Sequence, residues 1–120
     1  MNIEDLRLWC LEKAGVTESL PFGDDTLVFK VGTKMFLLAN LDGPLWLNIK
    51  AQPEHVIERL EHYPAAKPGY HMNKTHWFMV DPIGLGDDKL LLRWIDESYH
   101  LVLSGLPAKT RKEITETTPL

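Results

Sequence analysis

Three short strand patterns between residues 27 and 50 constrain the fold of this chain more than any other feature. In 27–31, Leu27, Phe29 and Val31 alternate with Val28 and Lys30, which is a strand pattern. The segment 34–39 is almost continuously apolar and directly follows Gly32 and Thr33, a tight-turn pair. After a loop over 40–44, in which Asp42 precedes Gly43, residues 45–50 alternate again. Because antiparallel neighbours can be joined by such short connections, these segments predict an antiparallel meander.

Helical patterns flank this meander. Before it, apolar residues recur every three or four positions from Ile3 to Ala14, with Asn2 as a capping residue and Gly15 as a stop. After it, the patterns predict a short helix that opens at 52–54 and closes at 63–64, a strand over 76–80, an amphipathic helix from 87 or 88 to 105, and a last helix over 107–114. Residues 65–74 are predicted to form a loop, and 83–86 a turn.

Strands grouped between helices favour an α+β fold over an alternating parallel array. We expect an antiparallel sheet with the N-terminal and C-terminal helices packed on one face, and with the other face open to solvent or covered by loops. The length of 120 residues fits one domain. We assign that domain to residues 1–114 and expect 115–120 to be a frayed tail.

The composition is that of a soluble globular protein, with 44% hydrophobic and 25% charged residues. Cys10 is the single cysteine, so it forms no internal disulfide, and its place on the first apolar stripe predicts core packing. The sequence shows no signal peptide and no run of roughly 20 apolar residues, which predicts a cytoplasmic protein without a membrane segment.

The net charge of −4 is unevenly distributed along the chain. Residues 1–25 hold two basic and six acidic residues, whereas 26–80 hold six basic and four acidic ones. From His62 to Val80 there is no acidic residue at all. The total charge excludes coating of nucleic acid by bulk cationic charge, but a local anion-binding surface is compatible with it, as is a loop that is basic by chance.

Motifs for catalysis are missing from the sequence. It contains no glycine-rich nucleotide loop and no nucleophile elbow. His71 and His76 lie five residues apart, without the partners that metal sites require. We therefore predict a protein that is not an enzyme and that uses neither a cofactor nor a metal ion.

Two segments are candidates for binding. The first is the loop from Lys67 to Trp77, which mixes cationic, amide, imidazole and aromatic side chains and can contact phosphates. The second is the sheet face opposite Leu45, Leu47 and Ile49, where alternation places Trp46, Asn48 and Lys50, with Val28 and Lys30 beside them. An exposed Trp46 next to lysines can stack on a base or contact a protein. For Trp77, core packing is the favoured interpretation over stacking.

Several short motifs resemble the MmcQ/YjbR family. They are Phe22-Gly23-Asp24 before a strand, Leu47–Lys50 before a Pro-Glu helix start, the run from Gly69 to Trp77, and Ser98-Tyr99 in the long helix. The resemblance covers nearly the whole chain and implies a fold similar to CyaY, the bacterial frataxin homologue, with helices on an antiparallel sheet. It also implies DNA binding through a double wing of β-hairpins, and it supplies no catalytic residues.

These observations lead to three hypotheses, of which DNA binding is the first. In it, Lys67 and Lys74 contact phosphates, the patch extends through Lys30, Lys34 and Lys50, and Trp46, His71, Asn73 and His76 are further contact candidates. The second hypothesis is a protein-interaction module that uses Trp46 and the open sheet face. The third borrows from the frataxin-like fold and places iron on the acidic first helix, which holds Glu4, Asp5 and Glu12, and on the first strand. The oligomeric state is not predicted.

Overall fold

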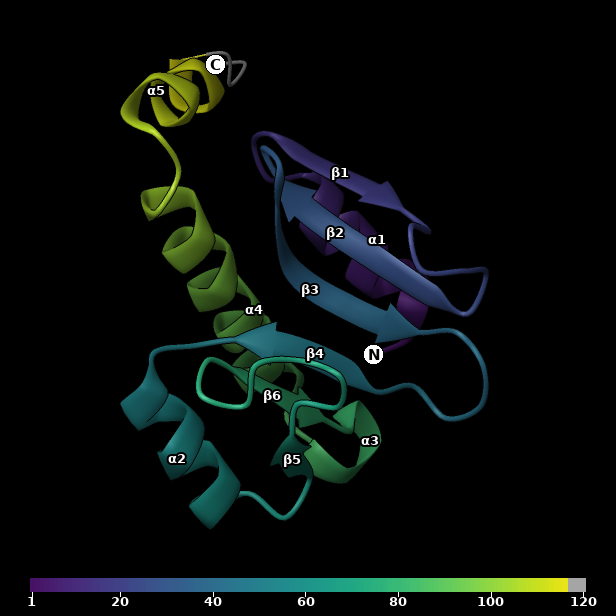
Figure 1. The fold of residues 1–120 in the computed structure, drawn as a ribbon. Helices are drawn as coiled ribbons and strands as arrows, with labels where there is room; N and C mark the ends of the chain where they lie inside the picture. Colours follow the sequence, from purple (N-terminus) through teal and green to yellow (C-terminus); the bar gives the residue numbers. More distant parts are fainter. Residues whose placement is uncertain (117–120) are drawn as a thin grey trace.

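The computed structural model describes residues 1–116, and a six-stranded antiparallel sheet in the order β1-β2-β3-β4-β6-β5 runs through it (Figure 1). The predicted meander is confirmed as β2 (Thr26–Val31), β3 (Lys34–Asn40) and β4 (Leu47–Lys50). The predicted fourth strand is β6 (Trp77–Val80), which pairs with β4. The α+β class is therefore correct, and a helix follows β4 along the chain.

Both edge strands were absent from the sequence prediction. They are β1 (Val16–Ser19), which pairs with β2, and β5 (Ala66–Pro68), which lies inside the predicted loop and pairs with β6. Each is four residues or shorter and has little buried apolar surface. Such strands are defined by the hydrogen bonds of a neighbour rather than by a side-chain pattern, so periodicity does not reveal them.

Helices α1 (Ile3–Leu11) and α4 (Asp88–Ser104) cover one face of the sheet, as predicted (Figure 1). α1 is shorter than its apolar stripe, because Glu12 already closes it and Gly15 turns the chain into β1 with φ +73°. The other helices are α2 (Pro53–His62), α3 (Pro82–Leu85), which replaces the predicted turn, and α5 (Ala108–Glu116). Residues 115 and 116 thus belong to α5, and the rest of the predicted tail, 117–120, lies outside the described residues.

The main core lies between the sheet and the helices. Phe36 packs edge-on against Tyr99 of α4 with ring centroids 5.5 Å apart, and both side chains are buried. The buried Ser98 hydroxyl donates to the carbonyl oxygen of Phe36 at 2.6 Å and accepts the amide of Lys50 at 3.1 Å, so one side chain of α4 bridges β3 to the end of β4. Cys10 is fully buried in this core, and burial raises the pKa of its thiol to about 12.

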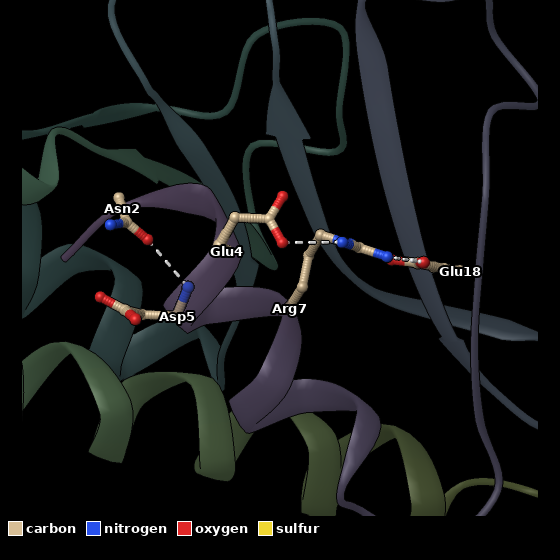
Figure 2. A network of polar contacts seen from close by, with 5 residues as sticks. All are labelled: Asn2, Glu4, Asp5, Arg7 and Glu18. Carbon is tan, nitrogen blue, oxygen red and sulfur yellow. Dashed lines mark hydrogen bonds and ion pairs between the residues drawn. The ribbon is translucent and has the colours of Figure 1, made fainter.

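A polar network fixes α1 on the sheet (Figure 2). The Asn2 side chain accepts the amide of Asp5 at 2.9 Å, which caps the helix as predicted. One turn later, Nε of Arg7 donates to Glu18 of β1 at 2.8 Å, and its guanidinium also pairs with Glu4 at 3.0 Å. The hydrogen bond from Arg7 lowers the pKa of the Glu18 carboxyl. Arg7 thus ties a helix to an edge strand that has few apolar contacts of its own.

Candidate functional site

The pairing register brings one side chain from each strand into a row on the face away from α1 and α4. The row is Ser19, Val28, Leu38, Asn48, Met79 and Lys67, in spatial order across the sheet. Directly paired residues of an antiparallel sheet project from the same face, so the register alone defines this surface. We call it the open face.

A second row of the open face contains Thr17, Lys30 and Met35, beside the pair of Lys50 and Trp77. A β-bulge between Phe29 and Lys30 makes this row possible, because it leaves Phe36 unpaired and returns Met35 to the open face. No strand position that projects from the open face is acidic. The acidic residues of α1 and α4 lie on the opposite side of the sheet.

Two of the predicted lysines, Lys30 and Lys50, lie on the open face, whereas Lys34 pairs with the core residue Val31 and lies beside that face. Lys30 and Lys50 are half-buried, and Lys34 is exposed at the start of β3. Lys34 and Lys50 line a depression of about 300 Å³ at the end of the sheet, whose other walls are Met35, Trp77 and the C-terminal end of α4. Lys67 is exposed on the open face at the far edge. Lys74 is exposed in the loop before β6, and the strand register does not group it with the other four predicted lysines.

That loop, residues 69–76, crosses the open face in front of β4 and β6 (Figure 1). Met72 packs on a small cluster of Val28, Leu38 and Trp77, so the loop covers part of the sheet. Gly69 permits this close approach, because an added Cβ would lie 3.0 Å from both Cβ and the carbonyl oxygen of Trp77.

Two of the predicted contact residues shape the loop. Asn73 accepts the amide of Thr75 with its side chain at 2.9 Å, and its carbonyl oxygen accepts the amide of Trp77 at 2.9 Å. The carbonyl oxygen of His76, whose side chain is half-buried, accepts the amide of Ala51 at 2.9 Å and ties the loop to the end of β4. Trp77 is only 7% exposed and packs with Val28 and Leu38, which fits core packing. Its ring therefore offers no surface on which a base could stack.

A pocket of about 390 Å³ lies between this loop and the sheet. Its floor is the central part of the open-face row, and its walls come from the 69–76 loop, from the loop before β2, and from the segment before β4. The lining residues are Phe22, Thr26, Leu38, Asn40, Trp46, Asn48, Tyr70, His71, Met72 and Met79. The lining is mainly apolar, as is usual for small-molecule sites.

Aromatic side chains surround the mouth of the pocket. Phe22 and Tyr70 are exposed by 61% and 67%, unusually high values for such rings, and Trp46 is half-buried. The Tyr70 and His71 rings contact each other with centroids 4.0 Å apart, and His71 has a left-handed backbone with φ +61°. A non-glycine residue in this conformation is uncommon and marks a locally constrained loop.

Asn40 positions the tryptophan at the pocket. Its amide donates to the carbonyl oxygens of Asp42 at 3.0 Å and Pro44 at 2.7 Å, and its side-chain oxygen accepts the amide of Trp46. All of its hydrogen-bonding groups are thereby used within the β3–β4 loop. Asn48 differs, because its Oδ1 is buried and has no hydrogen-bond partner.

Sequence reasoning placed Trp46 and His71 among the candidates, and the structure brings them to one pocket. The sequence did not indicate Phe22, Tyr70 or Asn48 as site residues. The alternation of 45–50 had already placed Asn48 on the open face, but nothing local indicated that its oxygen lacks a donor.

The iron hypothesis gains no support from the geometry. Within residues 1–116, no three histidine, cysteine, aspartate or glutamate side chains are grouped as a metal site would need. Glu4 of the acidic helix instead pairs with Arg7. In the same range no helix has both the length and the apolar content to span a bilayer.

Comparison with curated proteins gives relatives that carry no assigned activity. The Uncharacterized protein YbdF of Escherichia coli O157:H7 is 38% identical over 112 residues, which are 92% of this chain and 92% of that protein. The Uncharacterized protein YyaQ of Bacillus subtilis strain 168 is 34% identical over 55 residues, 46% of each chain.

Solved structures share the fold. A Deinococcus radiodurans protein, DR2400, described by the domain DUF419, is 38% identical, with a TM-score of 0.88 over 99% of this chain and 91% of that one. A Pseudomonas syringae protein is 26% identical, with a TM-score of 0.73 over 85% of this chain and 99% of that one. The family model described as YjbR matches residues 11–101. The resemblance seen in the sequence motifs is confirmed, and this chain belongs to the YjbR family.

Proposed function

We propose that this protein binds single-stranded DNA along the open face of its sheet, and that binding rather than catalysis is its activity. The observation that carries the proposal is the charge of this face. Its strand positions hold Lys30, Lys50 and Lys67 and no acidic residue, although the chain as a whole has a net charge of −4. A phosphate backbone would thus meet cations on this face and repulsion on the helix face.

Aromatic rings beside these lysines favour a single strand over a duplex. Trp46, Phe22 and Tyr70 border the pocket next to the lysine-bearing strands. Proteins that bind single strands combine a basic track for the backbone with rings on which unpaired bases stack. In duplex DNA the base faces are stacked on one another and unavailable to such rings. The β2–β3 hairpin, with Lys34 at its tip, would act as one wing.

The number of lysines sets the expected salt dependence. For single strands, the slope of log K against log salt is about −0.7 per neutralised phosphate, so three contacts from Lys30, Lys50 and Lys67 predict a slope of about −2. This is a weak and salt-sensitive interaction, consistent with an acidic protein. The proposal keeps the cytoplasmic location expected from the sequence.

The test is a fluorescence-anisotropy titration of a labelled oligonucleotide of about 12 nucleotides at salt concentrations from about 20 to about 200 mM. We expect Lys30→Gln with Lys50→Gln to reduce the magnitude of the slope by about 1.4, because two phosphate contacts are removed. Lys67→Gln with Lys74→Gln tests the loop in the same way, and its effect shows whether Lys74 joins Lys67.

The matched control removes two exposed lysines of the helices, Lys89→Gln with Lys109→Gln, and changes the net charge equally. It should leave the slope unchanged. Equal weakening by the control, or no binding of the wild-type protein at about 20 mM salt, would overturn the proposal. A salt-insensitive protein partner would then be the better hypothesis, with the exposed Phe22 and Tyr70 as its contacts.

A further inference from the structure

We infer that the pocket beneath the 69–76 loop holds one flat heteroaromatic ring whose N–H group donates to Oδ1 of Asn48. The inference deepens the proposed function and rests on it, since the ring would be an unstacked base of the bound strand. A free nucleoside would present the same chemistry. The size of the pocket, its apolar surfaces and the buried, unpartnered oxygen of Asn48 lead to this ligand.

Size and lining fit a single ring. The volume of about 390 Å³ lies at the lower end of the range for small-molecule sites, roughly 300–1,000 Å³. Leu38 and Met79 form an apolar floor from neighbouring strands, and Trp46 and Tyr70 stand at the border. A flat ring buries both faces in such a site, whereas a branched polar ligand would lose hydration without gaining partners.

Asn48 supplies the polar specificity. Its Oδ1 is buried without a donor, and leaving such an acceptor unpaired is unfavourable. The side chain lies in the centre of β4 and lines the pocket, and rotation about its terminal torsion is soft, so the oxygen can turn toward a donor in the pocket. Asn40, the other amide in the lining, is already satisfied by its own loop.

The ligand class follows from these two requirements. Every DNA base is a flat ring system with at least one N–H donor on the edge that pairs in a duplex, and that edge is free only in a single strand. Purely hydrocarbon rings would fill the floor but leave Oδ1 unpaired. Strongly anionic ligands find no lysine or arginine in the lining, where His71 is the one basic side chain.

The experiment compares an intact deoxyadenosine strand of about 12 nucleotides with an abasic strand of the same length and with adenosine alone. The abasic strand keeps every phosphate, so the lysine contacts of the proposed function remain. We expect the intact strand to bind at least about 10-fold more tightly, which corresponds to the stacking of one base. Asn48→Leu should reduce this ratio by about fivefold, the effect of one lost hydrogen bond, and leave abasic binding unchanged.

Two readouts keep the result interpretable. Asn48→Leu removes an unpaired buried acceptor, so its melting temperature should not fall, and Thr17→Val replaces a polar side chain elsewhere on the open face as a control. Binding at the pocket should also shift the NMR signals of the Trp46 indole and the Asn48 side-chain amide.

The outcomes separate the two proposals. Equal affinity for intact and abasic strands would overturn the inference and leave the proposed function standing. Failure of both strands to bind would overturn the proposed function. In that case, adenosine-induced shifts at Trp46 and Asn48 would support the ring site with a free nucleoside as ligand, and their absence would overturn the ring site too.

Discussion

The two faces of the sheet are built differently, although the same strands supply both. On the helix face, Phe36, Leu91 and Ile95 belong to one continuous core beneath α1 and α4. On the open face, the buried cluster consists of Val28, Leu38 and Trp77 under a loop. A helix covers a sheet with a dense row of side chains, whereas a loop covers it in places and leaves gaps.

This difference separates stability from binding. The helix face holds most of the buried apolar surface, and the hydroxyls of its buried residues Ser98 and Tyr99 are hydrogen-bonded. The open face retains a pocket, half-buried lysines and the unpartnered Oδ1 of Asn48. Substitutions on the two faces should therefore affect different measurements.

The largest expected effect is on the helix face. Phe36→Ala removes a fully buried ring that contacts Phe29 and Tyr99, and we expect a loss of about 3–5 kcal/mol in the free energy of unfolding. Leu38→Ala, two residues along the same strand on the open face, should cost only about 2 kcal/mol, because its site borders an existing pocket. Urea denaturation measures both, and an equal cost for Leu38→Ala would contradict the asymmetry.

The next effect concerns the bridge between α4 and the sheet. Ser98→Ala leaves the amide of Lys50 and the carbonyl oxygen of Phe36 without their partner, so we expect a loss of about 1–3 kcal/mol. Hydrogen exchange of the Lys50 amide should accelerate in the variant. Unchanged protection of that amide would show that the bond at 3.1 Å contributes little.

A smaller effect is expected from the crossing loop. Gly69→Ala places a methyl group 3.0 Å from the backbone of Trp77, which cannot yield, so the loop must move away from β6. We expect about 1 kcal/mol of destabilisation, the lower end for overpacking, because the loop itself is largely exposed. Thermal unfolding gives the cost. Gly105→Ala, where φ is −87° and the nearest atom to an added Cβ is 3.6 Å away, controls for the loss of a glycine.

The Arg7–Glu18 pair predicts a pH dependence. The folded protein holds the pKa of Glu18 below its unfolded value, so the pair stabilises the fold above a pH of about 4.3 and loses its contribution as pH falls through the folded pKa. Glu18→Gln should therefore melt at a lower temperature than the wild type at pH 7. The gap should close on acidification, and a gap that persisted at low pH would rule out the charge as its cause.

The smallest effect on stability is expected from the lysines of the open face. Lys30→Gln with Lys50→Gln should change the free energy of unfolding by no more than about 0.5 kcal/mol, because neither side chain forms an ion pair with a described residue. The same variant should lose about two thirds of the salt dependence of DNA binding. A strong loss of stability would mean that these lysines are part of the packing and would remove the contrast between the faces.

Most elements could be predicted from the sequence because their signals are local. The alternation of 45–50 and the apolar stripe through Leu91 and Val102 each identify an element within one segment. β1 and β5 could not be predicted, because a neighbour's hydrogen bonds define them. The motif over 69–76 indicated a binding loop. In the structure, Asn73 and His76 accept hydrogen bonds from backbone amides and so shape the loop, whereas Tyr70 and His71 line the pocket.

The sequence by itself determined the α+β class, the family, and the face on which Trp46, Asn48 and Lys50 lie, since alternation within a strand is a local property. Only the tertiary structure decided which side chains meet. Phe22, Trp46, Tyr70 and Met79 come from four separate segments, and the strand register and the crossing loop place them around one pocket. Whether the oxygen of Asn48 has a donor depends on every neighbour packed against it, and no local pattern in a sequence records that.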